Sequence, residues 1–408
     1  MTPALLAKLI SGEGAALLAS LPPYDEAEAF VLGDRLRMEG FDPDLIAAAL
    51  TQSRLRSRAE RKFGKDARQM LFTPDGLEQA TRHQVARLHA RRLADSGTRL
   101  VHDLGCGIGA DARAFAAAGL RVTAVDADEV TAGVADHNLR HWTHASARHD
   151  FAERVGAPDR LSAPDAGVWL DPARRTPGVS DINGRTRRTF RLDQLTPSWE
   201  FVLEAAAGAA AAGVKLSPSL THPQVPPGTQ AQWTSYDGEV VECVLWWNAA
   251  AWDLGRSALV VSDQFAYEVL ERDAAGADPG TARLDRLHGY LYEADRAIIR
   301  AGLTGALVQR VDGVELDAGL GMVSSPRDVV VPWAKKYAVT EAMPFNLKAL
   351  RSWIRDHRIG RLTIKKKGAS TDPDALRRQL RLKGDGQATI LLTRIGGAQA
   401  VLMLVPAP

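Results

Sequence analysis

Cysteine and long apolar runs are the scarcest features of this sequence. Only Cys106 and Cys243 are cysteines among its 408 residues, too few for a disulfide framework or a cysteine-based zinc site. No stretch approaches the roughly 18 consecutive apolar residues that a bilayer-spanning helix needs. Residues 1–20 mix apolar side chains with Lys8 and Glu13, unlike the basic start and apolar centre of an export signal. We therefore predict a cytoplasmic protein with no membrane segment and no metal.

Internal repeats and low-complexity tracts are also absent, so the length predicts two or three compact units. Residues 1–95 space their apolar side chains as one helix face does, which predicts a helical N-terminal region. Residues 96–270 alternate short apolar strands with helices, which indicates an α/β domain with a mostly parallel sheet. A stretch rich in Gly, Ala and Pro at 273–280 predicts a linker. Residues 281–408 then predict a smaller α+β domain.

The predicted α+β domain has an uneven charge. Within it, residues 290–303 are expected to form a helix, and residues 346–404 a helix, strand, helix, strand and strand. Residues 331–408 hold 15 Lys or Arg against five Asp or Glu, a net charge of +10 in a chain whose total is +2. Clustered basic side chains are typical of proteins with a phosphate-rich partner. A solvated basic face without any partner is the alternative.

The sharpest motif lies where an apolar strand turns into a helix. Glycines 105, 107 and 109 permit positive φ and let a ligand lie against the backbone at a helix N-terminus. The spacing of Gly105, Gly107 and Ala110 also satisfies the relaxed dinucleotide fingerprint, so a nicotinamide or flavin enzyme is an alternative. Asp103 favours a cationic ligand such as S-adenosylmethionine, because its carboxylate can face an ammonium group and would repel a pyrophosphate.

A second aspartate, Asp126, ends the next predicted strand, where it can accept hydrogen bonds from ribose hydroxyls. That role suits NAD and S-adenosylmethionine equally. Residues 103–109 resemble the first motif, acid-x-Gly-x-Gly-x-Gly, of the Rossmann-like methyltransferase superfamily. The resemblance implies a seven-strand sheet and S-adenosylmethionine as cofactor, with Gly105, Gly107 and Gly109 against it. It also implies that Asp126 binds the ribose, that Asp150 contacts the adenine amine and that Phe151 lies against the ring.

A reaction-centre motif follows in the apolar run that ends at Asp171-Pro172. A carboxylate there lies at the carboxyl edge of the sheet, where open α/β sheets bind ligands. The pair resembles the first half of the Asp/Asn-Pro-Pro-aromatic motif of nucleic-acid methyltransferases, which implies hydrogen bonds to a base amino group. Ala173 and Arg174 depart from that motif. The guanidinium groups of Arg174 and Arg175 can instead stack on a base or hold a phosphate.

Two further segments carry resemblances. Residues 70–81 resemble the stretch ahead of the core in trimethylguanosine-synthase-like enzymes, which closes over the methyl donor and implies a contact from Thr73. The alternative is that Thr73 only caps the helix that follows.

Residues 361–394 resemble the THUMP-like domain, and THUMP domains bind RNA. Lys365, Lys366 and Lys367 are consecutive strand residues and cannot all face a core, so some must be exposed and available to RNA.

The hypothesis from sequence is a methyltransferase that uses S-adenosylmethionine and acts on RNA, by in-line transfer to a base held near Asp171 and Pro172. Three alternatives stay open. The chain could be a small-molecule methyltransferase whose C-terminal domain covers the pocket or mediates dimerisation. It could be a non-catalytic RNA-binding protein, or the dinucleotide enzyme considered above. The sequence gives no oligomeric state.

Overall fold

The computed structural model describes residues 1–156, 161, 163–173, 191–278, 280, 282–287 and 289–407. The chain divides into two compact units, each described separately. Unit 1 comprises residues 1–230 and 243–254, and unit 2 comprises residues 231–242 and 255–408. The sequence instead placed residues 96–270 in one domain, and its domain ranges stay predictions. No helix in the described ranges has both the length and the apolar character needed to cross a membrane.

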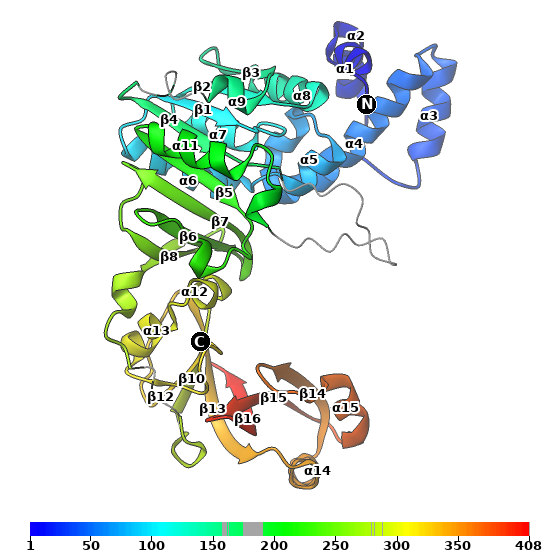
Figure 1. Ribbon diagram of the computed structural model, residues 1–408. Helices are drawn as coiled ribbons and strands as arrows, with labels where there is room; N and C mark the ends of the chain where they lie inside the picture. Colours follow the sequence, from blue (N-terminus) through cyan, green and yellow to red (C-terminus); the bar gives the residue numbers. More distant parts are fainter. Residues whose placement is uncertain are drawn as a thin grey trace. The chain divides into compact units, whose positions relative to one another are not determined.

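Helices fill the first part of unit 1 (Figure 1). Asp42 starts the longest of them by accepting hydrogen bonds from the backbone N–H groups of Asp44 and Leu45, which the start of a helix otherwise leaves unpaired. The apolar faces of the helices before residue 80 form one cluster, which also includes Ile108 and Val134 from the sheet domain. The helix over 83–95 instead packs its apolar face into the cluster around Trp169. The helices are α1 (Pro3–Ile10), α2 (Gly12–Ser20), α3 (Ala29–Met38), α4 (Pro43–Phe63), α5 (Pro74–Gln79) and α6 (His83–Asp95).

The α/β part is built on a sheet whose strand order is β3-β2-β1-β4-β5-β7-β6-β8-β9. Strands β3, β2, β1, β4 and β5 are parallel neighbours, and β7 runs antiparallel to β5. The described residues therefore give nine strands instead of the expected seven, because the antiparallel pair β8 and β9 extends the sheet. The strands are β1 (Leu100–Leu104), β2 (Arg121–Asp126), β3 (Ala145–His149), β4 (Ala166–Leu170), β5 (Ala211–Leu216), β6 (Gln230–Tyr236), β7 (Glu239–Asn248), β8 (Gly255–Val261) and β9 (Ala266–Leu270). The connecting helices are α7 (Ala110–Ala117), α8 (Glu129–Leu139), α9 (Ala152–Val155) and α11 (Trp199–Gly208).

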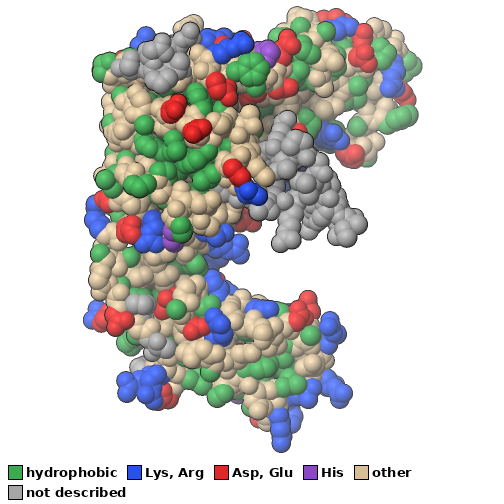
Figure 2. Space-filling view, viewed as in Figure 1, with side chains coloured by type: hydrophobic (Ala, Val, Ile, Leu, Met, Phe, Trp, Pro, Cys, Tyr) green, Lys and Arg blue, Asp and Glu red, His purple; other side chains and the backbone are tan. Residues whose placement is uncertain are grey.

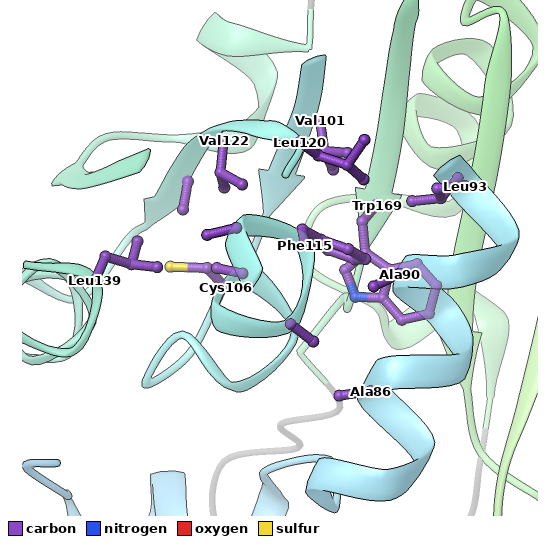
Figure 3. Packing of buried hydrophobic residues seen from close by; sticks show 14 of the residues in the cluster. Ala86, Ala90, Leu93, Val101, Cys106, Phe115, Leu120, Val122, Leu139 and Trp169 are labelled. Atoms are coloured by element: carbon purple, nitrogen blue, oxygen red, sulfur yellow. The ribbon is translucent and has the colours of Figure 1, made fainter. Parts of the chain in front are cut away.

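An aromatic cluster packs one face of this sheet against α6 and α7. Trp169 of β4, Gly213 of β5 and Trp246 of β7 are register partners across three neighbouring strands. The two indole centroids lie 5.7 Å apart, and the imidazole of His89 on α6 lies 4.5 Å from that of Trp169. Figure 3 shows Trp169 beside Phe115 of α7. Glycine at 213 leaves the space that both indoles occupy.

Unit 2 contains a second sheet, with strand order β11-β12-β10-β13-β16-β15-β14. The predicted order of elements over 346–404 is confirmed. The predicted helix over 290–303 is wrong at its start: Tyr290 and Tyr292 lie on a strand between β12 and β13, and helix begins only at Arg296. The elements are β10 (Gly289–Ala294), α12 (Arg296–Ala301), α13 (Thr304–Val311), β11 (Val314–Glu315), β12 (Met322–Ser325), β13 (Ala334–Pro344), α14 (Leu347–Asp356), β14 (Ile359–Lys366), α15 (Pro373–Leu380), β15 (Gly386–Ile395) and β16 (Ala398–Pro406).

Replacing Gly213 with alanine is expected to destabilise unit 1. A Cβ atom there would lie 2.6 Å from the Trp169 ring and 2.7 Å from the Trp246 ring, and such overpacking costs about 1 to 3 kcal/mol. Denaturation followed by tryptophan fluorescence measures the loss. Gly12→Ala is the control, because a Cβ at that helical position meets nothing within 4 Å. Equal midpoints for Gly213→Ala and the wild type would contradict this account of the packing.

Candidate functional site

The glycine loop lies at the carboxyl end of β1 and leads into α7. Gly105, Gly107 and Gly109 all have positive φ, at 87°, 55° and 78°, a region that side chains with a Cβ rarely adopt. A Cβ on Gly105 would come within 2.9 Å of the backbone oxygen of Asp171, whereas the space at Gly107 is open. The backbone N–H of Gly105 donates to the carbonyl of Val125. The loop is therefore fastened to β2 and keeps bare backbone toward the sheet edge.

Asp103 lies next to this loop and is 1% exposed. Neither of its carboxylate oxygens has a hydrogen-bond partner among the described residues. Burial, together with the nearby carboxylates of Asp111 and Asp171, raises the pKa of Asp103 well above its usual range. A buried carboxylate without a partner is costly, which points to a cationic ligand that would complete the pairing.

Asp126 has a fixed position at the end of β2. Its Oδ2 accepts the backbone N–H of Gly107 at 3.0 Å, and its Oδ1 accepts that of Asp128 at 2.9 Å. The first bond ties the carboxylate to the glycine loop, as a residue that binds the sugar of a nucleoside in that loop would require. The structure thus brings Asp103, Asp126 and the three predicted glycines to one edge of the sheet.

Asp150 and Phe151 follow β3 at the same edge. The hydrogen bond from the backbone N–H of Phe151 lowers the pKa of Asp150, and Arg148 contributes further. The Phe151 ring is 46% exposed, and the guanidinium of Arg154 lies 5.3 Å from its centroid. Phe151 is therefore partly open to solvent and partly covered by Arg154.

Asp171 follows β4, and sequence reasoning missed its partner. The Nζ of Lys215, at the end of β5, lies 2.5 Å from Asp171 Oδ2 and donates to Thr81 Oγ1 at 3.0 Å. Lys215 is only 6% exposed. Its signal in the sequence is a single lysine inside the apolar strand 211–216, since lysine is almost never buried unless it is paired. Pro172 is buried beside Asp171.

A second missed pair supports the start of α7. Asp111 accepts a hydrogen bond from Thr81 Oγ1 at 2.6 Å, and Nδ1 of His89 lies 2.9 Å from its other oxygen. Burial is the largest single influence and would raise the pKa of Asp111, but His89, Lys215 and the hydrogen bond from Thr81 together hold that pKa below its usual range. Lys215 Nζ lies 3.9 Å from the same carboxylate. Thr81 therefore connects Asp111 to Lys215.

Thr73 lies upstream of this network, and its hydroxyl accepts the backbone N–H of Gly76 at the start of α5. Thr73 thus caps the helix, and a cofactor contact from Thr73 in addition stays a prediction. The segment is held against the glycine loop, because Asn138 bonds both to Leu71 and to the carbonyl of Ile108.

Of the basic residues predicted to meet RNA, Arg174 and Arg175 lie outside the described residues. Lys365 Nζ donates to Glu293 Oε2 at 2.7 Å and to the hydroxyl of Tyr337, while Lys367 Nζ lies 3.7 Å from Glu293 Oε1. Burial would raise the pKa of Glu293, but Lys365, Lys367 and the hydrogen bond from Tyr337 together keep that pKa below its usual range. Lys366 is exposed. Lys365 and Lys367 are therefore engaged within unit 2.

Known proteins resemble this chain in both sequence and fold. Residues 334–406 match the family described as THUMP domain-like, and residues 2–59 match a domain of unknown function. The chain is 31% identical over 353 residues to an uncharacterized S-adenosylmethionine-dependent methyltransferase of Mycobacterium tuberculosis, covering 84% of this chain and 91% of that relative. It is 28% identical over 207 residues to the ribosomal RNA small subunit methyltransferase J of Laribacter hongkongensis, covering 47% of this chain and 65% of that relative. A crystal structure from Porphyromonas gingivalis W83, named as a methyltransferase, shares the fold with a TM-score of 0.71 and 18% identity over 95% of this chain and all of that one.

Replacing Asp103 with asparagine is expected to change stability and binding in opposite directions. At a pH above the raised pKa of Asp103, the substitution removes a buried charge without a partner, so the ligand-free protein should gain about 1 to 3 kcal/mol there. Binding of S-adenosylmethionine, measured by calorimetry, should weaken about 10- to 100-fold, since a charge-assisted hydrogen bond is lost. The exposed Asp95→Asn variant is the control for both measurements. A loss of stability in Asp103→Asn would refute the orphaned-carboxylate interpretation.

Binding of S-adenosylmethionine is also expected to release a proton. In the free protein the pKa of Asp103 is raised, and a bound ammonium would lower it, because an opposite charge favours the ionised form. Between these two values, binding removes the proton and affinity rises with pH; above the free-state value the release stops. Calorimetry in buffers of different ionisation enthalpy counts the protons. No release at any pH would mean that Asp103 does not pair with the ligand.

Proposed function

The chain belongs to the family of S-adenosylmethionine-dependent methyltransferases, and on that premise we propose that it methylates RNA in the cytoplasm. The observation that carries the RNA assignment is the THUMP domain-like match over 334–406, in a stretch of net charge +10. Figure 2 shows Lys and Arg side chains over α14 and α15 of unit 2. The ribosomal RNA methyltransferase among the relatives supports the same class of substrate.

The residues at the glycine loop fit the methyl donor. Asp103 would pair with the ammonium group of the donor, and Asp126 would accept hydrogen bonds from the ribose hydroxyls. The backbone of the three loop glycines would lie against the donor. The bound donor supplies a methyl group activated by a sulfonium. Transfer is an in-line displacement, so alignment and exclusion of water can suffice without a strong base.

The residues around the adenine and the segment before the first strand complete the proposed donor site. Asp150 would accept a hydrogen bond from the adenine amine, and Phe151 would lie against the adenine ring. Thr73 caps α5 close to the loop, so α5 is placed to shield the donor from water. Strands β3, β2, β1, β4, β5, β7 and β6 would then form the seven-strand sheet of the Rossmann-like methyltransferases, with β8 and β9 as an addition.

The acceptor would enter at the end of β4. Asp171 and Pro172 would receive the amino group of a base, and Arg174 would stack on the base or hold a phosphate. Arg175, Lys365, Lys366 and Lys367 would add phosphate contacts, with exposed Lys366 contributing more than the two lysines paired to Glu293. The pairing of Lys365 and Lys367 with Glu293 also favours the second candidate, a small-molecule methyltransferase, because two lysines bound to a carboxylate are less available to phosphate groups of RNA.

Total RNA from a strain that lacks the gene should accept labelled methyl groups from the purified protein. The acceptor nucleoside is then mapped by mass spectrometry. Binding to that RNA should weaken steeply with salt, as phosphate contacts require. Lys366→Ala should reduce the salt slope by about one, whereas Lys8→Ala, which removes a lysine paired with Asp42 on the N-terminal helices, should not. Label in the metabolite fraction, with none in RNA, would instead identify a small-molecule acceptor.

A further inference from the structure

Lys215 carries a buried charge, and it has no role in the transfer reaction proposed above. Its ammonium lies between two carboxylates of different elements, at 2.5 Å from Asp171 and 3.9 Å from Asp111. The hydroxyl of Thr81 accepts from Lys215 and donates to Asp111. One ammonium therefore connects the residue after β4, the segment between α5 and α6, and the start of α7.

We propose that Lys215 is a positioning residue of the methyltransferase site, which holds the Asp171 carboxylate at the acceptor edge and links it through Thr81 and Asp111 to the base of the glycine loop. The side chain of Lys215 would touch neither substrate. It acts by fixing where Asp171 lies, and a positional error of about 1 Å at a reacting centre can reduce a rate 100-fold.

Lys215 also balances the negative charge of the carboxylates around it. Removing one partner of a buried ion pair leaves an uncompensated charge, which is more damaging than the loss of the pair itself. Lys215 also lowers the pKa of Asp103, whereas Asp111 and Asp171 raise it. The titratable and charged groups around this network come from several elements: Asp103 of β1, Asp126 of β2, Asp171 after β4, Asp111 of α7, His89 of α6 and Lys62 of α4.

The test combines a binding profile with a stability cycle, and neither measurement needs an acceptor. It rests on the proposed pairing of Asp103 with the methyl donor, but not on RNA. In Lys215→Met, proton release on binding S-adenosylmethionine should persist to a higher pH than in the wild type, because the free-state Asp103 has lost a neighbouring cation. Lys8→Met removes a lysine that is paired outside the site and should leave the profile unchanged.

The stability cycle tests the contact between Lys215 and Asp171 directly. Asp171→Asn should lower the thermal midpoint of the wild type, because it leaves Lys215 with one carboxylate fewer. The same substitution should raise the midpoint of Lys215→Met, because it removes a half-buried carboxylate that no longer has the Lys215 ammonium beside it. This reversal of sign is not expected of a lysine that only fills space.

Each outcome decides the proposal. A proton-release profile in folded Lys215→Met that superimposes on the wild type overturns it, as does a cycle in which Asp171→Asn lowers both midpoints. Should Lys215→Met fail to fold, the double variant must recover folding, and its failure to do so is equally negative. If the wild type releases no proton at all, the pairing of Asp103 with the donor fails, and the cycle alone then decides the role of Lys215.

Discussion

Negative charge at the carboxyl edge of the parallel sheet, buried at Asp103 and half-buried at Asp126 and Asp171, is the constraint on which the site depends. Parallel strands bring Asp103, Asp126 and Asp171 to one edge because every strand ends there. Each of these carboxylates needs a partner. Asp126 accepts hydrogen bonds from backbone N–H groups, and Asp171 forms an ion pair with Lys215. The carboxylate of Asp103 has no hydrogen-bond partner in the described part of the chain. Of these three carboxyl groups, only that of Asp103 lacks a partner among the described residues, and it lies where the proposed donor would bring its ammonium group.

Sequence reasoning located the residues whose positions are set by local structure. Asp103 and the three glycines lie within one strand, turn and helix, so their spacing alone indicated the loop. Lys215, Thr81 and His89 could not be found in this way, because they are distant in sequence from their partners. Lys215 meets Asp171 through the pairing of β4 with β5, and Thr81 and His89 meet Asp111 through the packing of α6 on α7.

The errors in the predicted fold have the same origin. Residues 289–294 form a strand because β12 and β13 lie on either side of it, and the spacing of its apolar residues does not reveal those partners. The count of seven strands failed because β8 and β9 pair beyond the expected set. In unit 2 the run of three lysines indicated exposure, yet Glu293, more than 70 positions away, engages two of them. Long-range pairing therefore decides what a local pattern leaves open.

The same strands carry core residues and the charged residues of the site, so the packing of the core holds the charged residues in place. Asp103 is the register partner of Trp169, and Trp169 lies two residues before Asp171. The indole of Trp169 is buried against Trp246 and His89, and His89 in turn contacts Asp111. Because packed interiors move little, this aromatic cluster fixes the strand ends that carry both carboxylates. Gly213 is small for the same reason, since a larger residue would displace Trp169 and, with it, the edge where donor and acceptor would meet.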